Sequence, residues 1–120
     1  MIQGSLYSEG DNSCIVPKVS LTETMLERMK GLLWTDTLSE NTALIIKPCS
    51  SVHTLSMNYP IDLAYLDKYW VIIKTIENIK PWRFSASPRA SMVVELAAGS
   101  ISRLSLQPGQ KLIWQNAKND

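Results

Sequence analysis

The chain has 120 residues, of which 45% are hydrophobic and 19% are charged, so it suits one compact domain with a buried core and is too short for two. Twelve Lys and Arg residues oppose eleven Asp and Glu, and the net charge of +1 lacks the basic excess that drives general nucleic-acid binding. One histidine, His53, and two cysteines, Cys14 and Cys49, exclude a multi-histidine metal cage, a zinc ribbon and a disulfide-rich scaffold.

The N-terminal residues lack the basic start and the apolar stretch of a secretory signal. The longest strongly apolar run, around residues 70–73, is far shorter than the roughly 20 residues that span a bilayer. These features predict a soluble cytoplasmic protein with reduced thiols. We expect a single domain over residues 1–120, with flexible ends at about 1–13 and 116–120.

One helix is predicted in the N-terminal half. Ser20 and Glu23 have the spacing of a capping box, in which the two side chains satisfy free amides at a helix start. An apolar stripe at intervals of three and four residues follows, made of Leu21, Met25, Met29 and then Leu32 or Leu33. The helix ends at Gly31 or within residues 34–36, and its single apolar stripe indicates that it packs on a core.

Most of the remaining chain has the pattern of strands. Short β-branched or aromatic runs, bounded by Pro, Gly, Ser or charged residues, cover residues 43–46, 61–66, 69–76, 91–96 and 111–114. Asp67 and Lys68 suggest a tight hairpin, Pro108 and Gly109 a type II turn, and residues 98–104 a short helical turn capped by Ser100. The predicted fold class is mainly β (α+β), a small antiparallel β-barrel or sandwich with one α-helix packed on it.

A polar segment without charges marks the candidate site. Residues 48–61 contain no charged side chain, include Cys49, His53 and Met57, and are followed by Asp62. Polar, uncharged segments between apolar strands are typical of pocket walls, because hydroxyl and imidazole groups orient a ligand at a smaller desolvation cost than ions.

Three interpretations of Cys49, His53 and Asp62 are open. They form a nucleophile, base and orienting acid, which requires a bend because residues four apart on a straight strand are roughly 13 Å apart. Alternatively they bind a metal, although three mixed ligands with no second histidine are a weak pattern. In the third interpretation, which we favour, His53 and Asp62 hydrogen-bond in a pocket or polar network and Cys49 is a small buried filler.

Glu95 is an acid within an apolar run. Strand alternation turns it to solvent in one interpretation. In the other it is a partly buried carboxylate paired with Arg28 of the predicted helix, because burying either charge alone is costly.

Charge is divided along the chain. Residues 1–67 carry four bases and eight acids, residues 68–89 five and one, and residues 90–120 three and two, giving −4, +4 and +1. The basic segment includes Trp82 and Phe84. In the simplest interpretation it is a solvated loop whose Trp82 packs into the core, and in the other it contacts an anion or a partner.

Four ordered motifs carry a family resemblance. They are residues 28–33 (RMKGLL), His53 with Met57, residues 59–67 (YPIDLAYLD) and residues 90–99 (ASMVVELAAG). This set, over about residues 22–111, resembles the bacterial and archaeal domain of unknown function 192 family. The resemblance implies a small β-rich, barrel-like fold with a helix packed on it, and an unestablished biochemical role.

The resemblance also singles out positions. The family's shared polar residues correspond to Arg28, His53, Asp62 and Glu95, and its glycines to Gly31 and Gly99. Two positions depart from the family pattern: residues 55–57 read Leu-Ser-Met where many members have Phe-Trp-Met, and residues 109–110 read Gly-Gln in place of Gly-Asp.

The leading hypothesis is a domain without catalytic activity that binds a small molecule or a protein segment. Its expected ligand-binding residues are Arg28, His53, Met57, Asp62 and Glu95. The alternatives are a hydrolase or transferase dependent on Cys49 and His53, and an interaction scaffold using Trp82 and Phe84. We expect no cofactor, no metal, no general nucleic-acid binding, no membrane span, and a monomer or weak dimer.

Overall fold

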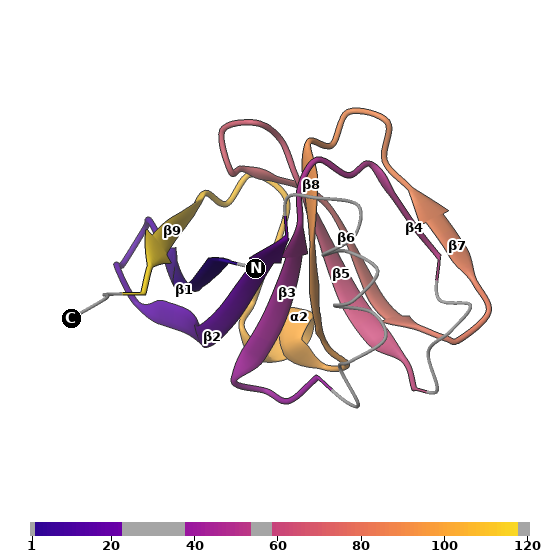
Figure 1. Ribbon diagram of the computed structural model, residues 1–120, viewed down its shortest axis with the longest axis horizontal. Helices are drawn as coiled ribbons and strands as arrows, with labels where there is room; N and C mark the ends of the chain where they lie inside the picture. The colour runs from indigo at the N-terminus through magenta and orange to yellow at the C-terminus, as the bar shows by residue number, and fades with distance from the viewer. Residues whose placement is uncertain (1, 23–37, 54–58, 118–120) are drawn as a thin grey trace.

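The computed structural model describes residues 2–22, 38–53 and 59–117, which form strands and one short helix (Figure 1). The strands build a seven-stranded sheet in the order β6-β5-β8-β3-β2-β1-β9 and a two-stranded sheet of β4 and β7. The elements are β1 (Ile2–Ser8), β2 (Cys14–Thr22), β3 (Thr42–Ile46), β4 (Ser51–His53), β5 (Ile61–Leu66), β6 (Ile72–Ile79), β7 (Phe84–Ala86), β8 (Met92–Ala97), α2 (Ser100–Arg103) and β9 (Leu112–Asn116).

The mainly β prediction is confirmed, and the larger sheet is strongly curved. Its strand pairs are antiparallel except β2 and β3, which run parallel. The edge strands β6 and β9 approach each other only through the isolated bridge Val71–Lys111. The sheet is therefore not closed into a barrel.

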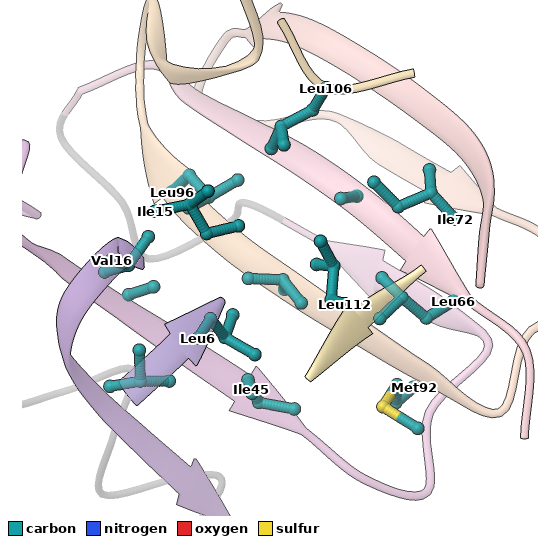
Figure 2. Close-up of a cluster of buried hydrophobic side chains, with 14 of the residues drawn as sticks. Leu6, Ile15, Val16, Ile45, Leu66, Ile72, Met92, Leu96, Leu106 and Leu112 are labelled. Atoms are coloured by element: carbon teal, nitrogen blue, oxygen red, sulfur yellow. The ribbon is translucent and has the colours of Figure 1, made fainter. Parts of the chain in front are cut away.

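The curved sheet has an apolar cluster on each face. The main core lies within the curve and gathers side chains from β1, β2, β9 and the central strands (Figure 2). The second cluster lies on the other face of the central strands and comprises Leu44, Ile46, Cys49, Val52, Ile61, Leu63, Tyr65 and Val93. Because β3, β5 and β8 are buried on both faces, they appear in the sequence as continuous apolar runs.

The two-stranded sheet covers the second cluster. Val52 of β4 belongs to that cluster, and its register partner Ser85 of β7 is buried. Tyr65 of β5 donates a hydrogen bond from its hydroxyl to Ser85 Oγ at 3.0 Å. This bond connects the two sheets through the second cluster.

The predicted hairpin at Asp67 and Lys68 is wrong in length. Asp67 Oδ1 accepts hydrogen bonds from the amides of Tyr69 at 2.8 Å and Val71 at 3.1 Å. These bonds hold residues 67–71 in a longer turn, in which Trp70 has a φ of 68°. As a result β6 begins at Ile72, three residues later than the predicted strand.

The N-terminal segment also differs from the sequence prediction. Residues 2–8 form β1 between β2 and β9, and Leu6 is fully buried, so this part of the expected flexible end is an integral strand. Ser20 lies in β2 and donates to Gln3 Oε1 at 3.1 Å, so it caps no helix. The rest of the predicted helix lies outside the described residues.

The C-terminal turn predictions agree more closely. Gly109 has a φ of 95°, and the Gln110 amide donates to the Gln107 carbonyl, as expected for a type II turn. The short helix α2 is present, but it is capped by Gly99 and not by Ser100. No helix in the described part of the chain combines the length and apolar character needed to cross a bilayer.

Candidate functional site

Glu95 of β8 lies on the face of the larger sheet that carries the second cluster. In the register of the larger sheet it is opposite Leu44 of β3 on one side and Leu63 of β5 on the other. Only 1% of Glu95 is exposed. The expectation that alternation turns it to solvent is therefore wrong, because β8 is covered on both faces.

The electrostatic setting of Glu95 is unusual for a carboxyl group. Within the part of the chain that the structure describes, its Oε2 atom has no hydrogen-bond partner. Burial raises the pKa of the carboxyl to about 7. Near neutral pH the group therefore exists in both protonated and charged forms, and it is able to donate or accept a hydrogen bond.

Tyr65 supplies a second buried polar group on the same face. Burial raises the pKa of its hydroxyl, an effect that the hydrogen bond to Ser85 partly opposes. A negative charge on either Cys49 or Glu95 raises the Tyr65 pKa further, so each of these groups lies within electrostatic range of the Tyr65 hydroxyl. Lys74 Nζ lies 5.9 Å from the centre of the Tyr65 ring and donates to the Ala86 carbonyl at 2.9 Å.

A pocket of about 490 Å³ opens at the end of the second cluster. Its wall contains the first four residues of the charge-free segment, and it is lined by Pro48, Cys49, Ser50, Ser51, Ala90 and Ser91. Two backbone hydrogen bonds hold its rim together, from the Cys49 amide to the Ser91 carbonyl and from the Ser87 amide to the Ser50 carbonyl. Ser91 precedes Val93 by two residues and Glu95 by four, so an extended backbone places it on the same face as these two residues. Four residues of extended chain put Ser91 roughly 13 Å from Glu95.

Cys49 is a buried wall residue of this pocket. The residue is 8% exposed, and its thiol donates a hydrogen bond to the Ser51 carbonyl at 2.9 Å. It belongs to the second cluster, which agrees with the interpretation of Cys49 as a small buried filler.

Asp62 lies on the opposite face of the sheet from Cys49. Its Oδ1 accepts a hydrogen bond from the Asn78 amide at 2.7 Å, and its Oδ2 accepts from Gly99 at 3.1 Å and Ile101 at 2.9 Å. These bonds fix the start of α2 and the end of β6. The structure therefore does not join Asp62 to Cys49 as a catalytic or metal-binding group, and the place of Asp62 in the expected ligand-binding set stays a prediction.

The other expected site residues are described in part or not at all. His53 ends β4, and its backbone pairs with that of Phe84. Arg28 and Met57, like the side chain of His53, lie outside the described residues. No three His, Cys, Asp or Glu side chains group around a possible metal position in residues 2–22, 38–53 and 59–117.

Sequence reasoning missed Tyr65 and Ser85. Tyr65 lies in a run of six buried residues, and a tyrosine hydroxyl in such a run requires a hydrogen-bond partner. That requirement was a usable signal. Ser85 gave none, because β7 has only three residues.

Comparison with known proteins now identifies the family. The profile of the DUF192 family, described as "Uncharacterized ACR", matches residues 7–114. The chain belongs to the DUF192 family. It is 36% identical over 66 residues to the UPF0127 protein PF1050 of Pyrococcus furiosus, covering 54% of this chain and 56% of that protein. It is 24% identical over 102 residues to the UPF0127 protein TK1120 of Thermococcus kodakarensis, covering 81% and 64%.

Two solved structures share the DUF192 fold seen here. One is a Sinorhizobium meliloti protein described as a candidate transcription regulator, with a TM-score of 0.78, 19% identity, and coverage of 94% of this chain and 92% of that chain. The other is a Novosphingobium aromaticivorans protein of unknown function, with a TM-score of 0.73, 19% identity, and coverage of 93% and 84%. At this identity the likeness is one of fold.

Proposed function

We propose that this DUF192 domain binds a small molecule bearing a hydrogen-bond donor or acceptor on the face that carries Glu95. The observation that carries the proposal is the buried Glu95 carboxyl, whose Oε2 has no partner among the described residues. Leaving a buried polar atom without a hydrogen bond costs about 1–3 kcal/mol. A bound ligand that supplies the missing bond removes that cost.

The surroundings of Glu95 support a ligand of mixed character. Leu44 and Leu63 flank it with aliphatic surface, and Tyr65 brings a hydroxyl to the same face. Small-molecule sites commonly combine an apolar lining with a few placed polar groups. The pocket at Cys49, whose Ser91 wall is roughly 13 Å from Glu95 along β8, provides concave surface at the end of the second cluster. His53, Met57 and Arg28 belong to the same proposal as further ligand-binding residues.

The test is amide chemical-shift mapping of the full chain against small molecules with amine, amide or hydroxyl groups. We expect shifts at Tyr65, Ser85 and Val93. Substituting Glu95→Leu should weaken binding by about tenfold or more, because it removes a charged-group hydrogen bond worth roughly 1.5–3 kcal/mol.

The matched control is Glu77→Leu, which removes an exposed carboxyl from β6 and should leave binding unchanged. Shifts confined to β1, β2 and β9, or equal binding by Glu95→Leu, would contradict the proposal.

A further inference from the structure

Two exposed aromatic side chains stand beside β7. Trp82 and Phe84 are 69% and 71% exposed, the highest values among the large hydrophobic residues of the described chain. They flank Arg83, which is also exposed. We call Trp82, Arg83 and Phe84 the aromatic surface. β7 begins at Phe84 and lies at the rim of the molecule, on the side opposite β9 (Figure 1).

The backbone presents these side chains outward. Ser85 is buried and accepts the Tyr65 hydrogen bond, so strand alternation directs Phe84 away from the second cluster. Trp82 has a φ of 65°, in the left-handed region that is costly for a bulky residue. The fold therefore holds the Trp82 side chain in water on a strained backbone, and the expectation that Trp82 packs into the core is wrong.

The chain segment that carries the aromatic surface is basic. Residues 80–89 contain Lys80, Arg83 and Arg89 and no acid, and all three bases are exposed. The nearest acid along the chain is Glu77, which precedes this segment. A partner whose charge is complementary to this surface is acidic.

We propose that the aromatic surface docks an acidic protein segment that also carries apolar side chains. Trp82 and Phe84 would bury the apolar side chains of the segment, and Arg83 would pair with its carboxylates. Tryptophan and arginine are the residue types that most often dominate binding energy at protein interfaces. A protein partner is favoured over nucleic acid because the whole chain has a net charge of only +1.

The test is the fluorescence anisotropy of short fluorescein-labelled peptides in which Glu alternates with Leu or Phe. We expect saturable binding to the full chain, and binding weaker by about tenfold for Trp82→Ala and Phe84→Ala. Arg83→Glu should weaken binding further, and peptides with Lys in place of Glu should not bind. The substituted side chains are exposed, so circular dichroism should show an unchanged fold.

The matched control is the double variant Lys68→Glu and Tyr69→Ala. Tyr69 is 63% exposed, and Lys68 Nζ lies 5.2 Å from the centre of its ring. Both residues lie in the turn that precedes β6, whereas the aromatic surface follows the other end of β6. This variant should bind the acidic peptides like the native chain.

Three results would overturn the proposal. The first is no saturable binding of the acidic peptides, or equal binding by the Trp82, Arg83 and Phe84 variants. The second is preferential binding of labelled oligothymidylate, which would assign the surface to nucleic acid. The third is self-association of the native chain that Trp82→Ala abolishes, which would make a second copy the occupant. Unchanged peptide binding by Glu95→Leu would show that this surface acts independently of the Glu95 site.

Discussion

Glu95 places an ionisable group among aliphatic side chains, and the consequence is a stability that depends on its protonation. Ionisation is costly there because Leu44 and Leu63 flank the carboxyl and no described residue donates to its Oε2. The pKa is raised by burial from 4.5 to about 7. Between these two pH values the folded chain holds a proton that the unfolded chain has released.

The substitution Glu95→Gln removes this titration and isolates its effect on stability. As pH rises from 4.5 to 7, the free energy of unfolding of the native chain should fall relative to that of the variant, by about 3 kcal/mol. Below pH 4.5 the carboxyl is protonated in both states, and above pH 7 the difference is constant. Urea unfolding of both proteins over this range measures it. A difference that moves in favour of the native chain with rising pH would indicate a cationic partner for Glu95, as the predicted pairing with Arg28 requires.

At the scale of the element, β5 serves both faces of the larger sheet. Tyr65 points to the second cluster, whereas Asp62 points to the other face and accepts three backbone amides. Two of the bonded residues, Asn78 and Gly99, have φ values of 55° and 93°. Asp62 thus stabilises two irregular segments that meet beside β5, which is a structural role.

Replacing Asp62 with Ala should therefore destabilise the fold strongly. Three amides would lose a charged acceptor, and the cost should be at least about 3 kcal/mol in the free energy of unfolding. Asp11→Ala is the control, because Asp11 is exposed and its side chain bonds to Ser13, so this substitution should cost much less than Asp62→Ala. Chemical denaturation of both variants measures the loss in the free energy of unfolding that each substitution causes. Equal costs would show that the Asp62 bonds add little to stability.

The sequence predicted the elements whose burial is reflected in composition. Four of the five predicted strands overlap β3, β5, β8 and β9 within two residues at either end. β3, β5 and β8 are apolar runs because both of their faces are buried. β9 is mostly exposed and is recognised by its β-branched and aromatic residues. β2 was not predicted because the exposed Pro17 and Lys18 interrupt its alternation of apolar and polar residues. β4 and β7 were not predicted because three residues are too few to show an alternation. Asp62 was grouped with Cys49 because they are close in the sequence. The sheet register, which the sequence does not reveal, separates them onto opposite faces.

At the scale of the whole molecule, β9 holds the curved sheet together. The Leu112 amide donates to the Trp70 carbonyl and the Ile72 amide to the Gln110 carbonyl, which joins the two ends of the sheet. The rings of Trp70 and Trp114 stack with centres 6.3 Å apart. Main-core residues of β1, β6 and β9, including Leu6, Ile72 and Leu112, lie inside the curve that these contacts hold (Figure 2).

Gly4 is the position where β1 and β9 approach each other too closely for a side chain. A Cβ at Gly4 would lie closer to the Gln115 carbonyl and the Trp114 ring than real Cβ atoms do, so Gly4→Ala should push β9 away from β1. We expect a loss of about 1–3 kcal/mol in the free energy of unfolding and a weaker near-ultraviolet dichroism signal from the stacked Trp70 and Trp114 rings. Gly10→Ala, where the added Cβ would have ordinary contacts, should change neither quantity. If Gly4→Ala keeps both the stability and the dichroism of the native chain, β9 does not pack tightly on Gly4.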